Sequence, residues 1–439
     1  MAGDRLIDAD GEDPKHADSA RVSTVAPPTV RPVRLGRRLT SNTFSAFEVP
    51  AYRWFFLSSI AGTVGYQMQG VALGWLVYIL TGSAVHLGLI TTTQAICQVA
   101  VSPMAGVIAD RVERRTYIML VRLITVVTAA VLAALIVTHR ITFPELVIGA
   151  AIFGVGFGLN GPARQALLAQ LVGNERLINA VSLMSGGMNL MRIVGPAAAG
   201  FLIGAIGVPG IYVLLVLCYL GVIAALVPVP PQPVAPRHPG RNAVGDLVDG
   251  ISYSYRHPAV FGLLLLGTVP LFFAMPYVPL LPVFAEGIWH TGATGFGILS
   301  AAPGIGGFIG ALAVASFTNF HRKGRLTIAS VSIYGLSLSA FALAPSFHVA
   351  VVFLMVAGVA AVAYSATVSS LVQSIIPNEM RGRVMSFYQM SFGISGLSAL
   401  PVSAIASSIG TPVAVAGCGI LVVMSGLLIY RLRPVLGEL

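Results

Sequence analysis

Apolar runs of about twenty residues recur along the chain from Trp54 onward, and no other feature constrains its fold as strongly. The hydrocarbon core of a bilayer is about 30 Å thick, and a helix needs about 20 apolar residues to cross it. Only 10% of all residues are charged and 56% are hydrophobic, with a mean hydropathy of +0.85, so this apolar surface cannot be hidden in a soluble core. The sequence therefore predicts an all-α membrane protein.

Twelve transmembrane helices are predicted from these runs. The predicted spans are residues 53–80, 84–109, 116–138, 145–172, 178–205, 208–229, 258–285, 291–318, 326–345, 348–376, 383–409 and 412–431. Cytoplasmic loops are enriched in Lys and Arg, and all but four of the 26 basic residues lie in the tails, the even-to-odd loops or the adjoining helix ends. Of those four, Arg140 faces outside, and Arg122, Arg164 and Arg192 lie within spans. Both termini are therefore predicted to be cytoplasmic.

A proline-rich stretch divides the predicted spans into six and six. Residues 230–257 contain too many prolines for a helix and are predicted to form a cytoplasmic linker. The six-helix bundles on either side are predicted at 51–229 and 258–432. The cytoplasmic tails are 1–50, predicted to be disordered and basic near the membrane, and 433–439.

The two halves also resemble each other in sequence. Asn174-Glu175 is followed by Ser182, and the same pattern returns 204 positions later as Asn378-Glu379 followed by Ser386. This agreement with the hydropathy pattern indicates a parallel duplication and predicts two pseudo-symmetric six-helix bundles.

The loop after the second predicted span carries the most specific motif. It reads Gly106-Val-Ile-Ala-Asp110-Arg111-Val-Glu-Arg114-Arg115 and fits the pattern G-x-x-x-D-R-x-x-R-R. Gly106 would let two helices approach closely, while Asp110 can accept hydrogen bonds from a helix N-terminus and pair with an arginine. Positive-inside charge alone accounts for the arginines, but it does not account for the Gly and the Asp.

With this loop, the chain resembles the major facilitator superfamily over nearly everything from about Arg53 to Arg431. The resemblance implies that the loop latches the cytoplasmic side of the outward-facing state, with the helix N-terminus near Arg383 as the partner of Asp110. The equivalent stretch of the second half has Val314 at the Asp position, so a latch is predicted in the first half only.

The fifth predicted span contains Arg192-Ile-Val-Gly195-Pro196-Ala-Ala-Ala-Gly200, which resembles the Gly-Pro motif of antiporters in that superfamily. There, a glycine-lined and proline-bent helix controls a leak path. Met191 stands where the pattern expects a glycine, which weakens the antiporter inference. Close helix packing with a proline kink is the open alternative.

Several phrases narrow the resemblance to a bacterial branch that includes enterobactin exporters and macrolide efflux proteins. They are Trp75-Leu-Val-Tyr-Ile-Leu-Thr-Gly-Ser83, Glu175-Arg-Leu-Ile-Asn179-Ala-Val-Ser182 and Gln373-Ser-Ile-Ile-Pro377-Asn-Glu-Met-Arg381-Gly382-Arg383-Val384. This resemblance implies a secondary active transporter of the plasma (inner) membrane. It would export a drug, a macrolide-like compound or a siderophore by alternating access, in exchange for protons.

Polar residues inside the spans are candidates for the transport cavity, because they are costly in lipid. Arg192 lies about 21 Å into its span at 1.5 Å per residue, too deep to reach the cytoplasmic surface, and is expected to have an interior partner. Asn189 shares its helix face, and Arg164 could line the cavity, bind an anionic group or clamp loop carbonyls. Further candidates, each with helix packing as the alternative, are Tyr66, Gln67, Gln69, Gln94, Gln98, Asn160, Tyr364 and Gln389.

The coupling group is left open by the sequence. No Asp or Glu lies near the middle of a predicted span, where a proton-coupled antiporter usually carries a carboxylate. Asp110, Glu145, Glu286, a histidine such as His86, or the substrate itself are the alternatives.

Several classes of protein are disfavoured by what the sequence lacks. It has no Walker A motif, no Ser-His-Asp set, and three cysteines without a CxxC pair, so neither an enzyme, nor a cofactor, nor a metal site is expected. Its net charge of +10 lies in short segments between apolar runs, which argues against nucleic acid. Arginines at 31–38 should favour anionic lipids, and a monomer is expected. Alternatives are a lysophospholipid or lipid carrier, an importer, and a non-transporting sensor or scaffold.

Overall fold

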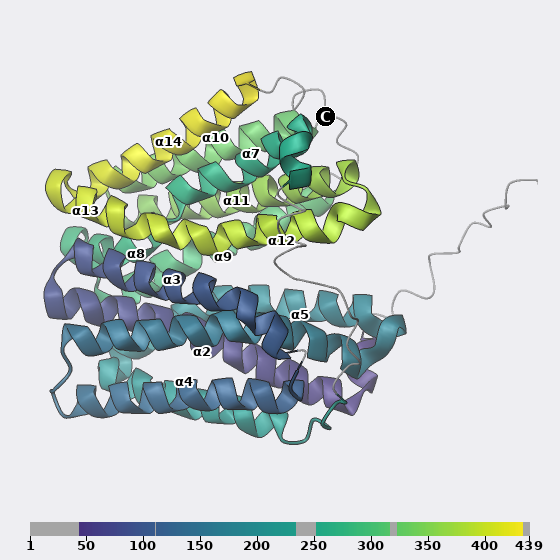
Figure 1. Ribbon diagram of the computed structural model, residues 1–439. Helices are drawn as coiled ribbons and strands as arrows, with labels where there is room; N and C mark the ends of the chain where they lie inside the picture. Colours follow the sequence, from purple (N-terminus) through teal and green to yellow (C-terminus); the bar gives the residue numbers. More distant parts are fainter. Residues whose placement is uncertain (1–43, 110, 234–251, 317–322, 433–439) are drawn as a thin grey trace, which may run out of the picture. The chain divides into compact units, whose positions relative to one another are not determined.

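The computed structural model describes residues 44–109, 111–233, 252–316 and 323–432, and the secondary structure within these ranges is helical throughout (Figure 1). Nine helical segments of this part of the chain are long and apolar enough to cross a membrane. The predicted all-α, multi-pass class is therefore confirmed. The number of twelve crossings stays a prediction, because one apolar segment, Glu175–Leu226, runs for 52 residues and exceeds a single crossing.

The first group of helices comprises α2 (Pro50–Thr81), α3 (Ala84–Ala109), α4 (Arg114–Val137) and α5 (Phe143–Leu226). Two glycines interrupt α5, Gly173 at φ 69° and ψ 173° and Gly207 at φ 72° and ψ 175°. This backbone region is open essentially to glycine alone. The two breaks divide α5 into three parts, residues 143–172, 174–206 and 208–226, which we call its first, second and third parts.

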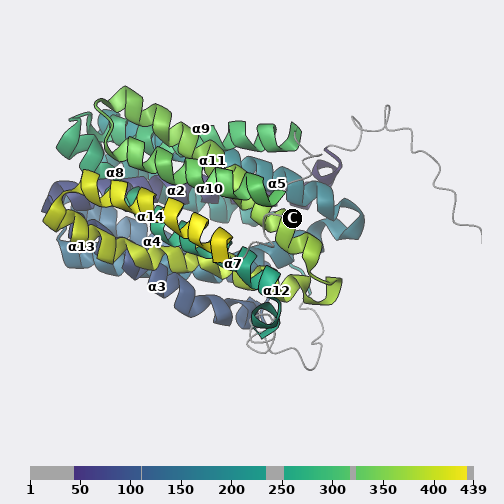
Figure 2. The ribbon, with the colours of Figure 1, turned by 90° about the horizontal axis from the view of Figure 1, so that it is seen from above.

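The second group begins after the undescribed residues 234–251, where most of the predicted linker lies. Its elements are α7 (Pro258–Ala274), α8 (Tyr277–Pro282), a π-helical turn (Val283–Ile288), α9 (Gly292–Ser316), α10 (Lys323–Ala342), α11 (Phe347–Ile375), α12 (Asn378–Ser395), a 3₁₀ turn (Gly396–Ser398), α13 (Ala399–Ile409) and α14 (Thr411–Leu432). Within this group α11 lies between α9 and α10, and α14 packs on α10 (Figure 2).

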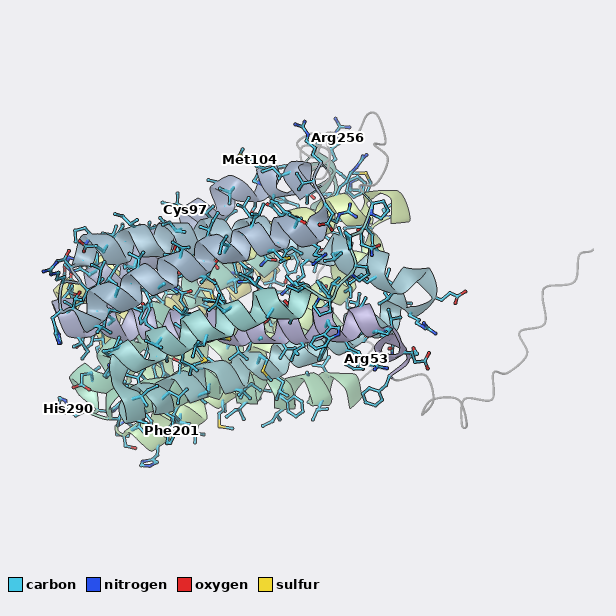
Figure 3. The ribbon with its side chains drawn as sticks, turned by 90° about the horizontal axis from the view of Figure 1, so that it is seen from below. Arg53, Cys97, Met104, Phe201, Arg256 and His290 are labelled. Carbon is cyan, nitrogen blue, oxygen red and sulfur yellow. The ribbon has the colours of Figure 1, made fainter. Side chains whose placement is uncertain are left out.

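Successive helices alternate in direction, so their connections gather at two ends of the described part (Figure 1). We call the end that holds Pro50 and Leu432 the terminal end, and the end that holds Gly82 and Gly410 the far end. Arg53 and Arg256 lie at the terminal end and His290 at the far end (Figure 3).

Close contacts join the two groups in the far half of the molecule. A Cβ added at Gly200, in the second part of α5, would lie 2.5 Å from the Cα of Gly297 on α9. On the other side of the molecule, a Cβ added at Gly88 of α3 would lie 2.6 Å from the Cβ of Ser403 on α13. The backbones therefore touch where side chains would hold them apart.

Hydrogen bonds strengthen the contact between α3 and the second group. The Thr92 hydroxyl donates to the carbonyl of Gly396 at 3.3 Å and accepts from the amide of Leu400 at 3.1 Å. Nearer the terminal end, by contrast, a Cβ added at Gly106 or Gly186 would meet no atom within 4 Å. The described contacts thus hold the two groups together in the far half.

A short 3₁₀ turn, η1 (Ser45–Glu48), fastens the start of α2 to the second part of α5. The amide of Ala46 donates to Oδ1 of Asn179 at 3.0 Å, and the Tyr52 hydroxyl donates to the carbonyl of Ala180 at 2.9 Å. An exposed ion pair joins Glu48 and Arg176 at 2.9 Å. This attachment gives Asn179, part of the phrase that also marks the family resemblance, a structural role.

We expect Asn179→Ala to lower the stability of the protein by about 1–3 kcal/mol, because it leaves the amide of the fully buried Ala46 without its acceptor. The matched control is Ser182→Ala, since that hydroxyl only donates to a carbonyl of its own helix, that of Ile178. Thermal unfolding in detergent measures both variants. Equal shifts in the melting temperature would argue against the attachment.

Candidate functional site

A cavity of about 410 Å³ lies between the two groups of helices, within the size range of small-molecule sites. The first group contributes Tyr66, Gln67, Gln94 and Pro196 to its wall, and the second contributes Phe296 and Pro303 among others. Three of the polar residues predicted to face a cavity, those at 66, 67 and 94, thus lie on one. Most of the remaining wall is apolar.

Tyr66 connects this cavity to the interior of the first group. Its ring stacks on Phe157 at a centroid distance of 4.4 Å, and its hydroxyl accepts a long hydrogen bond of 3.4 Å from Nε2 of Gln94. Arg192 lies one turn before Pro196, another residue of the cavity wall, and its charge acts on the Tyr66 hydroxyl. The cavity therefore borders on a positively charged group.

Arg122 of α4 is a site residue that sequence reasoning did not single out. With the amide oxygen of Asn160 turned toward it, Arg122 donates to that oxygen from Nη2 at 2.8 Å and from Nε at 3.1 Å. Its guanidinium also lies 5.8 Å from the centroid of the Tyr219 ring. Gly62 leaves the necessary room, because a Cβ there would lie 3.0 Å from Nη2. The sequence did contain a signal, because Arg122 is one of three arginines that lie inside predicted spans and away from the span ends.

Arg164 and Arg192 complete a cluster of three arginines. Arg164 lies one turn after Asn160, the partner of Arg122, in the first part of α5, and the positive charges of Arg122 and Arg192 both act on it. Among the residues the structure describes, the side chains of Arg164 and Arg192 have no hydrogen bond or ion pair. Arg192 is exposed, as is Asn189, so the interior partner expected for Arg192 does not appear in this arrangement.

The helix with the antiporter-like motif packs against both groups. Gly195 packs on α2, since a Cβ there would lie 2.7 Å from the Cβ of Gln67. Pro196 lies on the cavity wall, and Gly200 touches Gly297 across the two groups. The non-helical residues within α5 are Gly173 and Gly207, so the backbone stays helical at Pro196. These contacts place the three residues against both groups, and both interpretations of the motif stay open.

Other predicted cavity residues have different surroundings. The Tyr364 hydroxyl donates to the carbonyls of Leu266 and Gly267 at 2.8 and 2.6 Å, which braces α11 against α7. The carbonyl of Gln98 packs against Gly158, where a Cβ would lie 2.7 Å from it. Gln69 is fully buried on α2. The side chain of Gln389 lies outside the described residues.

Asp110 of the motif loop lies outside the described residues, and so do the side-chain surroundings of Val107. The rest of the loop is described. Arg111 is exposed and Arg114 is half-buried. Arg115 donates to the carbonyls of Leu226 and Val227 at 3.0 and 2.8 Å, at the end of α5. Here an arginine caps a helix C-terminus, a role that its position in the motif did not predict.

Glu113, an unspecified position of the motif, caps the start of α4. Its carboxylate accepts from the amides of Arg115 and Thr116 at 3.0 and 2.7 Å, and from the amide of Gln232 at 3.2 Å. Burial opposes ionisation of this carboxyl, but hydrogen bonds from Thr116, Arg115 and Gln232 outweigh it and lower its pKa. The position of Glu113 directly before the start of a helix is the sequence feature that could have indicated this capping role.

Residues 41–438 match a protein family described as transmembrane secretion effector. Among curated proteins, the enterobactin exporter EntS of Escherichia coli is 28% identical over 342 residues, which cover 76% of this chain and 80% of the exporter. Macrolide efflux protein A of Streptococcus pyogenes is 26% identical over 335 residues, which cover 75% of this chain and 81% of that protein.

Solved transporter structures share the fold at low sequence identity. A bacterial homologue of the human lysosomal transporter Spinster, in an inward-facing and occupied conformation, has a TM-score of 0.72 at 14% identity and covers 88% of this chain and 97% of its own. The nucleoside transporter NupG has a TM-score of 0.67 at 14% identity, with 88% of this chain and 98% of the transporter covered. The helical arrangement is thus that of known transporters.

Proposed function

The chain belongs to the transmembrane secretion effector family of the major facilitator superfamily, and from this premise we propose that it exports small organic molecules by alternating access. The observation that carries the proposal is the cavity between the two groups of helices. A secondary transporter of this kind binds its substrate between two bundles that rock about a central site. Export is favoured by the relatives, which are named as an enterobactin exporter and a macrolide efflux protein.

The contacts between the groups support one half of an alternating cycle. The far half is closed by Gly200 on Gly297 and by Gly88 on Ser403, whereas Gly106 and Gly186, nearer the terminal end, face open space. In the proposal this is the state open toward the terminal end. The opposite state requires the far-half contacts to separate and the terminal end to close.

The membrane orientation and the domain limits are part of the same proposal. Described arginines at the terminal end, such as Arg53 and Arg256, favour a cytoplasmic terminal end by the positive-inside rule. The groups α2 to α5 and α7 to α14 correspond to bundles at 51–229 and 258–432, joined by the linker 230–257 and flanked by the tails 1–50 and 433–439. Each bundle would contribute six of twelve crossings in a monomer of the plasma membrane.

Protons are the proposed coupling ion, exchanged for substrate. This proposal rests on the resemblance of Gly195, Pro196 and Gly200 to the antiporter motif. Proteoliposomes loaded with a panel of drugs, siderophores and lysophospholipids provide the test, with and without an imposed pH gradient. We expect saturable flux of at least one organic compound that the gradient accelerates. Flux of lysophospholipids alone would favour the lipid carrier, and no saturable flux of any compound would contradict the transporter.

The proposed latch can be tested at Asp110. If Asp110 stabilises the state that is closed at the terminal end, Asp110→Ala removes part of that stabilisation and slows export by about fivefold or more, since coupling energies of this kind are about 1–3 kcal/mol. Glu175→Ala is the control, because it removes an exposed carboxylate at the terminal end outside the motif. Export from loaded cells, corrected for the amount of inserted protein, is measured. Equal rates for Asp110→Ala and the unaltered chain would count against the latch.

A further inference from the structure

We propose that the exported molecules are organic anions and that Arg122, Arg164 and Arg192 form their binding site beside the cavity. This inference rests on the proposed function and names the substrate class. The three side chains come from α4 and from the first and second parts of α5. Arg164 lies one turn after Asn160, whose amide oxygen accepts from Arg122, and the charges of both Arg122 and Arg192 act on Arg164.

The cluster adjoins the cavity near Pro196 and Tyr66, two residues of the cavity wall. Arg192 lies one turn before Pro196 and shares its helix face, and Pro196 lines the cavity together with Tyr66, on whose hydroxyl the charge of Arg192 acts. In the proposal, the ligand lies in the cavity and its charged group extends along this face of α5 toward Arg192. The aromatic and apolar wall, including Phe296, suits an apolar body, and the arginines suit a charged head.

The charge of the cluster is not balanced by the described part of the chain. Every carboxylate whose side chain the structure describes lies at a helix end or in a connection, at Glu48, Glu113, Glu145, Glu175 and Glu286. Arg122 has the amide oxygen of Asn160 and the face of Tyr219, which supply dipoles and not a negative charge. Adjacent cations within a membrane raise the free energy of the folded protein unless they are paired. A bound anion from outside the chain would therefore stabilise the cluster.

The three arginines have different roles in the proposed site. Arg122 is fixed by Asn160 and supplies a positive field from a set position. Arg164 and Arg192 have no described acceptor and can donate directly to a ligand. The planar fork of a guanidinium group matches carboxylate and phosphate oxygens in pairs, so these are the expected head groups.

Three probes distinguish the ligand classes. Fluorescein and rhodamine 6G share a xanthene body but are anionic and cationic, and lysophosphatidylglycerol is an anionic lipid. Binding to the purified protein is measured by the rise in melting temperature and by flux into proteoliposomes. We expect an anionic probe to be bound and rhodamine 6G to be bound at least tenfold more weakly. Preference for fluorescein indicates a soluble anion, and preference for the lysolipid indicates a lipid head group.

The arginine variants test the site itself. Arg164→Gln and Arg192→Gln should each weaken binding of the anionic probe at least tenfold, while Arg140→Gln, an exposed arginine at the far end, leaves it unchanged. Without ligand, Arg164→Gln should raise the melting temperature, because it relieves repulsion among the three cations. Arg122→Gln should lower it, since it removes the contacts with Asn160 and Tyr219. A merely structural Arg164 would lower the melting temperature when replaced.

Some results would overturn the inference and leave the transporter intact. Transport of rhodamine 6G at an equal or faster rate than both anions, or unchanged anion binding in Arg164→Gln and Arg192→Gln, contradicts the anion site. If no probe binds, the anion site is also contradicted. The exporter itself falls only if, in addition, the wider panel of drugs, siderophores and lipids shows no saturable flux.

Discussion

Replacing Gly358 of α11 with alanine is expected to lower the yield of folded protein severely and to destabilise what remains by about 3 kcal/mol or more. A Cβ at Gly358 would overlap the carbonyl group of Pro303 on α9, and a Cβ at Gly306 would overlap that of Met355 on α11. Backbone cannot swing aside as a flexible side chain can, so α9 and α11 would have to separate. This contact holds the second group of helices together.

Gly417→Ala is the matched control for this substitution. Gly417 lies in α14, where a Cβ would meet no atom within 4 Å. Alanine is favoured over glycine inside a helix by about 1 kcal/mol, so the control should be neutral or slightly stabilising. Folded yield and thermal unfolding in the same detergent compare the two variants. Similar behaviour would mean that α9 and α11 do not touch as closely as the structure indicates.

The second large effect is expected at Gly200, where the two groups meet in the far half. Gly200→Ala places a Cβ 2.5 Å from the Cα of Gly297 and 2.6 Å from the carbonyl oxygen of Ala293. Unlike the clash at Gly358, this one can be relieved by separating the groups, which the proposed cycle already requires. We therefore expect a folded protein that favours the state open at the far end and exports at least tenfold more slowly.

Gly186→Ala, in the same part of α5, serves as the control because a Cβ there meets nothing within 4 Å. The shift is measured by labelling a cysteine introduced at Gly204, an exposed position of the far half, with an impermeant thiol reagent. Labelling should be faster with Gly200→Ala than with Gly186→Ala. Equal labelling, or unimpaired export by Gly200→Ala, would show that this contact does not open during transport.

The helical class of the protein was predictable because hydropathy depends on composition over a whole span. The breaks at Gly173 and Gly207 lie where the predicted fourth, fifth and sixth spans end and begin, since a chain that must turn sharply uses glycine there. Contacts between helices that are distant in the sequence could not be predicted in this way. Nothing near Gly200 in the sequence indicates Gly297, and Gly88 and Ser403 lie even farther apart along the chain.

The candidate site shows the same limit. The cost of a charge in lipid identifies Arg164 and Arg192 individually as candidate site residues. It cannot show that Arg122 lies with them, because that depends on how three helix segments pack together. Asn160 and Tyr364 were sensible cavity candidates by polarity. In the folded chain Asn160 binds Arg122, and Tyr364 braces α7, since a buried polar group takes whichever partner packing brings.

Alternating access is tested most directly by locking the far half closed. Gly204 and Thr294 are both exposed, and a Cβ at Gly204 would lie 3.0 Å from Oγ1 of Thr294. Cysteines at these two positions, in a chain whose Cys97, Cys218 and Cys418 are replaced with alanine, should form a disulfide between the groups. Export by proteoliposomes is then compared before oxidation, after it, and after reduction. The proposed cycle predicts export that stops on oxidation and returns on reduction, whereas undiminished export by the fully cross-linked protein would contradict it.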